Sequence, residues 1–365
     1  MKIVSTSYVN ASEFSDPEQW LDRISFYTGI LEELTKQYEA ESIEQINYTG
    51  KLERKGVAYH FLNFKIPKLY FPRQLHSYIK RMQPDIVFVN GLIFPLQVIQ
   101  LRLKLGNRVK IIVWHRSEKP FTGIKKYLQQ LADKCVNAYL FTSLEFGKQW
   151  IEKDNIDQKK IREVMHGSSG FCPEDKAAAR TGLSIAGSLI FLWIGRLNAN
   201  KDPLTVIKAF IKFLSFQPLA KLYMIYQTEE LLQEASDLIK QDKKAIQSIK
   251  LVGKIPHQQL QPWYSSADFI ISSSHYEGGG IAVCEAMSCG CVPILTDIIS
   301  FRKMTGPGKC GLLYEPGNDE VLLKILLQTG QLNMEEERKK VLQQFKDELS
   351  FEAIAKKINT IINLL

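Results

Sequence analysis

The sequence predicts an α/β protein built from two doubly wound parallel sheets, each with helices on both faces. Two observations predict this class. Short apolar segments alternate with helical patterns along the chain, which is typical of parallel sheets. The alternation also occurs as two series, joined by a polar stretch containing Gly and Ser at 167–188. With 365 residues, 45% of them hydrophobic, the chain can form two or three domains with buried cores.

The elements of both series can be placed along the chain. The first series has expected strands at 2–9, 42–49, 57–64, 85–92, 110–116, 138–143 and 161–166. Its first helical pattern is 16–38, where Ser15 and Glu18 form a predicted capping box around Pro17. The second series has expected strands at 188–195, 221–227, 248–254, 269–274, 292–297 and 311–314, and helical segments at 333–348 and 351–364 end the chain. We therefore expect domains over 1–170 and 171–350, and a C-terminal helix over 351–365.

Three consecutive glycines, at 278–280, separate a predicted strand from a predicted helix that ends near Gly290. Such a turn leaves backbone N–H groups bare at the positive end of a helix, which favours an anion such as phosphate. Glu277 lies at the mouth of this turn, and Glu285 lies one turn into the helix. Two carboxylates beside a phosphate site suit a ligand with phosphate and hydroxyl groups, such as a sugar nucleotide. The alternative is a tight turn with solvated glutamates.

A second basic motif lies about eighty residues earlier. A predicted strand ends at Gly195, Arg196 follows it, and Lys201 directly precedes a helix that starts at Asp202 and Pro203. Both cations then lie in one loop at the carboxyl end of a strand, where open α/β sheets bind ligands. A guanidinium and an ammonium group together suit a diphosphate. Two exposed basic residues would be the interpretation of this motif alone.

These motifs resemble those of family 4 glycosyltransferases, a group of retaining enzymes with the GT-B fold. The resemblance is strongest over 188–317 and rests on Gly195, Arg196 and Lys201, on Val252-Gly-Lys-Ile-Pro256, and on Glu277 with Glu285. It implies that two Rossmann-like domains face each other across a cleft. The first would bind the acceptor, and the second would bind the nucleotide sugar.

The resemblance also implies roles for the matching residues. Arg196 and Lys201 match the pair that binds the donor diphosphate. Glu285 matches the glutamate that accepts hydrogen bonds from the ribose hydroxyls, and Glu277 matches the glutamate that faces the donor sugar.

Backbone contacts are implied as well. The turn at Gly279, Gly280 and Ile281 matches the segment that contacts the sugar and phosphates, and Lys254 with Ile255 matches the segment that passes the nucleobase.

His115 ends the predicted strand 110–116. A lone histidine there is more often structural, but the resemblance implies contact with the donor sugar and the acceptor. We therefore expect catalysis to involve His115, Glu277, Arg196 and Lys201, by front-face attack with retention and without a bound metal or cofactor. A glycosidase-type nucleophile at Glu277 is the alternative mechanism.

The chain departs from the family pattern in two places. Residues 5–10 contain no Gly-Gly loop after the first strand, and Met165-His166-Gly167 stands where relatives often place an asparagine or an acidic residue. His166 either lines the cleft or caps a strand.

Charge is distributed unevenly over the N-terminal half. Residues 51–134 hold seventeen Lys or Arg and four Asp or Glu, whereas residues 1–50 hold three and nine. Aromatic side chains are interleaved with the basic residues. Three interpretations stay open: a solvated basic surface, peripheral contact with anionic lipid, and a nucleic-acid surface. No nucleic-acid motif accompanies the charge, so we expect no nucleic-acid partner.

The six cysteines, at 135, 172, 284, 289, 291 and 310, form no Cys-x-x-Cys pair. Neither a zinc site nor a disulfide framework is indicated, and reduced thiols are typical of the cytoplasm. No signal peptide or membrane span is recognisable, so we expect a cytoplasmic protein, with membrane association through 51–134 on the cytoplasmic face as an option. Three functions remain: a sugar-nucleotide-dependent glycosyltransferase acting on a glycan or lipid-linked acceptor, another GT-B enzyme such as a phosphorylase or sugar-nucleotide epimerase, and a non-catalytic GT-B binding module.

Overall fold

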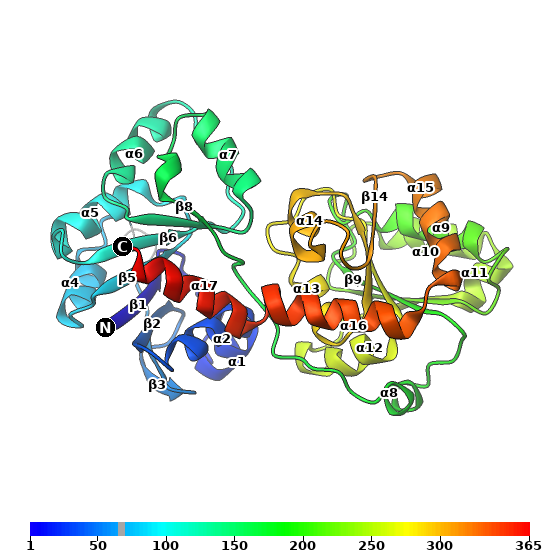
Figure 1. The fold of residues 1–365 in the computed structure, drawn as a ribbon. Coiled ribbons are helices and arrows are strands. Elements are labelled where there is room, and N and C mark those ends of the chain that lie inside the picture. Colours follow the sequence, from blue (N-terminus) through cyan, green and yellow to red (C-terminus); the bar gives the residue numbers. More distant parts are fainter. Residues whose placement is uncertain (65–69) are drawn as a thin grey trace. The chain divides into compact units, whose positions relative to one another are not determined.

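Two units form in the computed structural model, which describes residues 1–64 and 70–365 (Figure 1). Unit 1 contains Met1–Ser168 and Phe351–Leu365, and unit 2 contains Ser169–Ser350. Each unit holds one sheet in which nearly all neighbouring strands are parallel, with helices packed against it. The predicted α/β class with two doubly wound sheets is therefore confirmed.

Unit 1 is built on a sheet of order β3-β4-β2-β1-β5-β6-β7-β8. Its strands are β1 (Lys2–Ser7), β2 (Glu39–Gln45), β3 (Gly50–Arg54), β4 (Val57–Leu62), β5 (Ile86–Asn90), β6 (Lys110–Trp114), β7 (Ala138–Phe141) and β8 (Ile161–Glu163). Its helices are α1 (Pro17–Arg23), α2 (Ser25–Leu34), α4 (Arg73–Arg81), α5 (Pro95–Leu105), α6 (Ile124–Asp133), α7 (Leu144–Glu152) and α17 (Phe351–Asn363).

Unit 2 is built on a sheet of order β11-β10-β9-β12-β13-β14. Its strands are β9 (Ile190–Gly195), β10 (Lys221–Tyr226), β11 (Ile249–Gly253), β12 (Phe269–Ser272), β13 (Val292–Thr296) and β14 (Leu312–Tyr314). Its helices are α8 (Lys176–Gly182), α9 (Pro203–Phe213), α10 (Leu232–Lys240), α11 (Lys243–Ser248), α12 (Leu260–Ser266), α13 (Ile281–Ser288), α14 (Ile299–Thr305), α15 (Asp319–Gln328) and α16 (Met334–Gln344), the last followed by a π-helical turn, Phe345–Leu349.

One strand, β3, has no counterpart among the predicted elements. It pairs antiparallel with β4 through a two-residue turn at Lys55 and Gly56, both with positive φ (48° and 79°). Two consecutive left-handed residues are the signature of a hairpin turn whose twist matches that of the strands. The Lys-Gly dipeptide was a sequence signal for this turn. The strand before it was not predicted because β3 is an edge strand that buries little of its surface, so its sequence is charged and not apolar.

The first helical segment also differs from its prediction. Asp16, and not Ser15, caps α1: its Oδ1 accepts hydrogen bonds from the backbone N–H groups of Glu18 (2.9 Å) and Gln19 (3.2 Å). Helix α1 ends at Arg23, and α2 starts two residues later, so the predicted single segment is two short helices.

Both sheets have a topological switch point, where the chain moves from one side of the first strand to the other. In unit 1 this point lies between β1 and β5, and in unit 2 it lies between β9 and β12. Ligands of open α/β sheets bind outside the carboxyl ends of the strands at such points. The fold therefore directs attention to the loops that follow these four strands.

Helix α17 belongs to unit 1 although it follows unit 2 in the chain. Its apolar face, formed by Ile354, Ile358, Ile361 and Ile362, is buried. The ring of Phe351 lies over Gly29 of α2, where a Cβ atom would be 2.5 Å from the ring. Tyr38 also donates a hydrogen bond to Asn359. In the described residues, no helix combines the length and apolar character needed to cross a bilayer.

Packing of α17 can be tested with Ile358→Ala. This side chain is 1% exposed, so its truncation should destabilise unit 1 by about 2–4 kcal/mol. Exposed Lys356 on the same helix is the control, and Lys356→Ala should change stability by less than about 0.5 kcal/mol. Urea unfolding followed by circular dichroism measures both. Equal midpoints for the two variants would show that α17 does not stabilise unit 1.

Candidate active site

The site in unit 2 begins with the loop after β9. Asp202 adopts a left-handed conformation (φ 43°) and caps α9, because its Oδ1 accepts from the backbone N–H of Thr205 (3.3 Å) and its Oδ2 from the Thr205 hydroxyl (2.7 Å). The backbone N–H of Lys201 donates to the Asn198 side chain (3.0 Å). These bonds fix the backbone of the loop. Arg196 directly follows β9, and its side chain is exposed.

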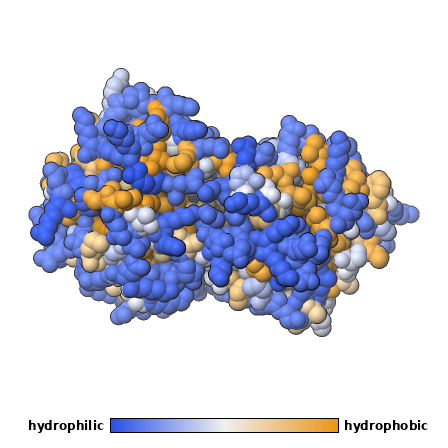
Figure 2. Space-filling model, in the orientation of Figure 1, coloured by the Kyte–Doolittle hydropathy of each residue, from blue (hydrophilic) through white to orange (hydrophobic). Residues whose placement is uncertain are grey.

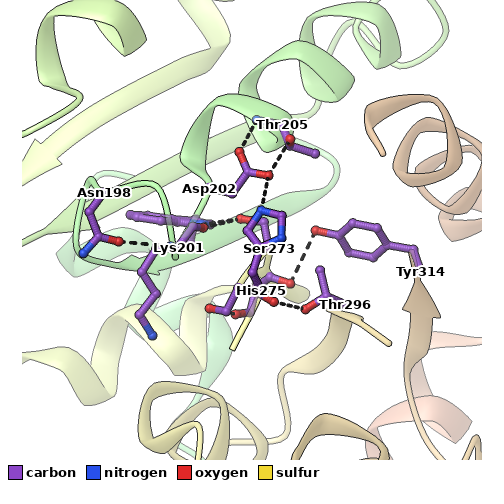
Figure 3. Close-up of polar contacts among 11 residues, drawn as sticks. Asn198, Lys201, Asp202, Thr205, Ser273, His275, Thr296 and Tyr314 are labelled. Carbon is purple, nitrogen blue, oxygen red and sulfur yellow. Dashed lines mark hydrogen bonds and ion pairs between the residues drawn. The ribbon is translucent and has the colours of Figure 1, made fainter. Parts of the chain in front are cut away.

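The loop after β12 is joined directly to the loop after β9. The Ser273 hydroxyl donates to the carbonyl oxygen of Lys201 (2.6 Å), and the backbone N–H of His275 donates to the carbonyl of Asn200 (2.9 Å). The His275 ring also lies 3.2 Å from Asp202 (Figure 3). Polar groups at the carboxyl ends of two adjacent strands therefore hold the two loops in one arrangement.

Two further strands brace the loop after β12. The Thr296 hydroxyl donates to the Ser274 carbonyl (2.6 Å), and the Tyr314 hydroxyl donates to the Ser272 carbonyl (3.4 Å) (Figure 3). The site is thus supported by rigid elements, which favours a fixed geometry over a flexible loop.

This arrangement brings Lys201 and Glu277 together. The Lys201 ammonium forms an ion pair with Oε1 of Glu277, and the Ser274 hydroxyl donates to the same oxygen (2.9 Å). The two charged side chains are only 26% and 15% exposed, so solvent and salt screen the pair less than they would on the open surface. Together with Gly280 and Ile281 they line a small pocket of about 30 Å³.

Helix α13 starts at this pocket without a side-chain cap. Gly280 occupies the cap position with φ 53°, and no side chain accepts a hydrogen bond from the first turn. The first-turn N–H groups of a helix have no partner within the helix, so they present a partial positive charge. A Cβ atom at Gly280 would lie 2.7 Å from the Phe301 ring, which explains why glycine is required there.

Glu285 lies in the second turn of α13 and is 5% exposed. Its Oε1 is 2.6 Å from Nε2 of His257, and its Oε2 accepts from the Tyr264 hydroxyl (2.8 Å). The ring of Phe171 stacks on His257, with centroids 5.1 Å apart. Burial and the neighbouring Glu285 raise the pKa of Tyr264, which therefore stays a hydrogen-bond donor at neutral pH. Glu285 is held in place by neighbours that differ from those of Glu277.

Lys254 and Ile255 follow β11 at the same edge of the sheet. Ile255 packs against the core of unit 2, and Lys254 is exposed. In the described part of the chain, no group of three His, Cys, Asp or Glu residues is arranged to hold a metal ion.

In unit 1, His115 is 1% exposed and lies in an aromatic cluster. Its ring stacks on Phe141 with centroids 4.5 Å apart, and its Nε2 donates to the Glu118 carbonyl (2.9 Å). Burial lowers the pKa of His115, so the ring is neutral at pH 7. This placement fits the structural alternative, because the ring is almost completely buried. The predicted contact with the transferred sugar stays a prediction.

Unit 1 has its own cavity, of about 330 Å³, at its switch point between β1 and β5. It is lined by Ser7, Val9, Ala11, Trp20, Ile24, Phe26, Tyr27, Glu44, Gln45, Asn90, Arg116 and His166. His166 is therefore a wall of this cavity, and burial lowers its pKa to about 3, so it is neutral. Ser7 and Val9 belong to the segment 5–10 that departs from the family pattern, whereas no motif pointed to the other lining residues. Arg116 lies two residues after the central strand β6, and that position was an available signal.

Comparison with known proteins identifies the second unit. Residues 175–348 match the family model of glycosyl transferases group 1. A GDP-mannose:cellobiosyl-diphosphopolyprenol alpha-mannosyltransferase of Komagataeibacter xylinus is 24% identical over 208 residues, which cover 56% of this chain and 48% of that protein. The alignment thus spans about half the length of this curated relative.

Residues 175–348 are therefore similar to group 1 glycosyl transferases.

Solved structures show the fold of the whole chain. A glycosyltransferase of Rickettsia africae superposes with a TM-score of 0.77 at 18% identity, covering 100% of this chain and 98% of that one. Anabaena HepE in complex with UDP superposes with a TM-score of 0.74 at 13% identity, covering 100% of both chains. The chain has the GT-B fold. The matched segment contains Arg196, Lys201, Glu277 and Glu285, and the structure brings Lys201 and Glu277 into direct contact.

The uncapped start of α13 can be tested with Gly280→Ala. Alanine in a left-handed conformation costs about 1–2 kcal/mol, and contact with Phe301 should add about 1–3 kcal/mol. Gly308→Ala is the matched control, because Gly308 also has positive φ (77°) but a Cβ atom there would meet nothing within 4 Å. Thermal unfolding measures both variants. Equal losses would show that close packing at Gly280 is unimportant.

Proposed function

We propose that the protein is a retaining, hexosyl-transferring glycosyltransferase of family 4 that moves a sugar from a nucleoside diphosphate sugar to a glycan or lipid-linked acceptor. The observation that supports this most is the meeting of Lys201, Glu277 and the uncapped start of α13 in one pocket. A cation and a bare helix start suit a diphosphate, and a carboxylate beside them suits sugar hydroxyls. Anabaena HepE was crystallised with UDP, which agrees with such a ligand.

The donor would exchange partners with an existing ion pair. In the structure, the Lys201 ammonium is paired with Glu277. A diphosphate would attract the ammonium more strongly than a single carboxylate does, because it carries more negative charge. Glu277 would then be free to accept hydrogen bonds from the sugar. Arg196, on the same loop with an exposed side chain, would reach the diphosphate from the solvent side.

Transfer breaks the bond between the anomeric carbon and the diphosphate oxygen, and negative charge grows on the departing diphosphate. Arg196, Lys201 and the N–H groups after Gly280 would stabilise that charge, and such preorganised stabilisation is usually the largest catalytic effect. The acceptor hydroxyl attacks from the same face, and its proton passes to an oxygen of the leaving phosphate. The configuration at the anomeric carbon is retained.

The nucleoside would bind beside Glu285 and the segment after β11. Glu285 is already oriented by His257 and Tyr264, so its carboxylate can accept hydrogen bonds from ribose hydroxyls without prior rearrangement of its backbone. The backbone at Lys254 and Ile255 would pass the base, and Gly279 with Ile281 would contact the sugar and phosphates.

The other candidate functions differ in measurable ways. A sugar-nucleotide epimerase or a phosphorylase with this fold would give products other than a glycoside formed from a nucleotide sugar. A non-catalytic module would bind nucleotides without turnover. A thermal-shift screen of uridine and guanosine diphosphate sugars, followed by a turnover assay with the stabilising donor, separates these options, because ligands that bind only the native state raise its unfolding temperature.

Substitutions of Lys201 and of Glu277 should affect diphosphate binding differently, although both should reduce transfer. Lys201→Ala should weaken nucleoside diphosphate binding and lower kcat/KM. The decrease in kcat/KM should correspond to a loss of about 2–4 kcal/mol of transition-state stabilisation. Glu277→Gln removes the carboxylate that competes for Lys201, so diphosphate binding should be retained or become tighter while transfer is lost. Calorimetry and a transfer assay measure the two effects.

Lys240→Ala is the control for these variants, since Lys240 is exposed at the end of α10. It should leave both binding and transfer unchanged. Unchanged diphosphate binding in Lys201→Ala would exclude Lys201 from the donor site, and full transfer by Glu277→Gln would remove Glu277 from the mechanism.

We also propose that the protein is cytoplasmic and that unit 1 contacts the anionic cytoplasmic face of a membrane. The surface concerned, here called the basic face, lies on α4, α5 and α6, which pack side by side. Its exposed apolar side chains are Leu103, Ile124, Tyr127 and Leu131. Its exposed basic side chains are Lys80, Arg81, Lys104, Arg108, Lys125 and Lys134. Figure 2 shows apolar side chains among hydrophilic ones in this part of unit 1. The predicted stretch 51–134 also includes 65–69, which lie outside the described residues.

The basic face can be tested by charge reversal. Each Lys or Arg near an anionic surface contributes about 1 kcal/mol, so Lys125→Glu with Lys134→Glu should weaken sedimentation with phosphatidylserine vesicles by about tenfold or more. Lys324→Glu in unit 2 is the control of equal charge type, since Lys324 is exposed on α15. Binding of the native protein should fall as salt rises. Absence of co-sedimentation at low salt would contradict membrane contact.

A further inference from the structure

The cavity of unit 1 has the position and size of a ligand site. It lies at the carboxyl ends of β1, β2 and β5, where Ser7, Gln45 and Asn90 line it, and its volume of about 330 Å³ is within the range of small-molecule sites. All of its lining residues belong to unit 1. It is therefore a complete feature of one unit.

Arg116 gives this cavity a positive charge. Its guanidinium donates to the carbonyl of His166 (2.6 Å) and to the side-chain oxygen of Asn90, and it lies over the rings of Tyr27 (5.2 Å) and Trp114 (4.9 Å). Burial lowers the pKa of Arg116 to about 10, so it is still a cation at neutral pH.

The guanidinium of Arg116 contacts only uncharged groups directly, and within residues 1–64 and 70–365 no carboxylate forms an ion pair with it. The carboxylates of Glu44 and Glu118 attract its charge from a greater distance, and Glu118 accepts a hydrogen bond from the backbone N–H of Arg116 (2.6 Å). Burial of a cation without a direct ion pair is costly, and an anionic ligand that paired with the guanidinium would offset part of that cost.

Glu44 also lines the cavity, but its carboxylate is already stabilised by hydrogen bonds from neighbouring side chains. Its carboxylate accepts hydrogen bonds from Trp20 Nε1 (3.0 Å), the Tyr27 hydroxyl (2.5 Å) and the Ser42 hydroxyl (2.7 Å). Burial also raises the pKa of Glu44, so taking up a proton costs less than it would in water. These bonds hold Trp20 and Tyr27 in place as an aromatic wall.

The remaining lining suits a compact, hydroxylated molecule. Trp20, Phe26 and Tyr27 line the cavity with aromatic side chains, and aromatic rings can pack against the apolar face of a sugar or polyol. Gln45 is 3% exposed, and its side-chain oxygen is buried without a hydrogen-bond partner among the described residues, so a ligand hydroxyl could donate to it after a small adjustment.

We propose that this cavity binds a sugar or polyol that carries an anionic group, a carboxylate or a phosphate, with that group paired to Arg116. The inference rests on the proposed function in one respect: such a ligand would be the acceptor, or the part of it next to the hydroxyl that is glycosylated. Arg116 is then a specificity-determining residue, because it selects charged over neutral acceptors.

Calorimetry with the full chain tests this, using glucose 6-phosphate, glucuronate and glucose as probes and no nucleotide. At least one anionic probe should bind about tenfold or more tightly than glucose, and its affinity should fall as salt rises. The two anionic probes separate phosphate from carboxylate recognition. Arg116→Gln should remove the preference for the anionic probe, and Arg116→Lys should retain part of it.

Arg108→Gln is the matched control, since Arg108 is exposed and does not line the cavity. It should leave anion binding unchanged. A preference for the anionic probe that persists in Arg116→Gln, or equal affinity of glucose and both anionic probes for the native protein, would overturn the proposal. Nucleoside diphosphate binding, measured on the same samples, reports on unit 2 separately. If the protein bound the anionic probe but no nucleoside diphosphate, the proposed function would be contradicted, whereas the anion site in unit 1 would not.

Discussion

The ion pair between Lys201 and Glu277 is the interaction on which the site in unit 2 depends. It joins the loop after β9 to the loop after β12, which are neighbours only because the chain crosses from one side of β9 to the other. The hydrogen bond from the Ser273 hydroxyl to the Lys201 carbonyl also joins the two loops, so the ion pair does not have to order them alone. A fully exposed ion pair would contribute little to stability. Because this pair is partly buried, its two charges are less screened and interact more strongly with a bound ligand.

The arrangement keeps its binding groups available while it satisfies the rest. The N–H groups at the start of α13 have no side-chain cap, and Gly280 adopts a left-handed conformation at the N-cap position, directly before the first residue of α13. Hydrogen bonds with His257 and Tyr264 hold Glu285 in position, and those with Thr205 and His275 hold Asp202. A site with fixed supports and a few free donors is preorganised, which lowers the reorganisation needed when charge develops.

Much of this could be predicted from the sequence because the signals are local. Every predicted strand appears in the structure within a few residues, and the cap at Asp202 follows from the Asp-Pro start of α9. What could not be predicted depends on contacts between distant segments. The unit 1 cavity takes Trp20, Glu44, Asn90 and Arg116 from four separate elements or loops, and no spacing along the chain reveals that they meet. The burial of His115 likewise depends on Phe141, which ends β7 and lies 26 residues later in the sequence.

The central claim is that a diphosphate binds against Lys201, Glu277 and the start of α13, and comparison of one nucleoside with its diphosphate tests it most directly. Calorimetry of the full chain with uridine and UDP, and with guanosine and GDP, measures what the two phosphates add. For the base that the protein accepts, the diphosphate should bind about a hundredfold or more tightly than the nucleoside, because charge-assisted bonds to Arg196, Lys201 and the start of α13 each contribute about 1–3 kcal/mol. Equal affinity of nucleoside and diphosphate for both bases would contradict the account.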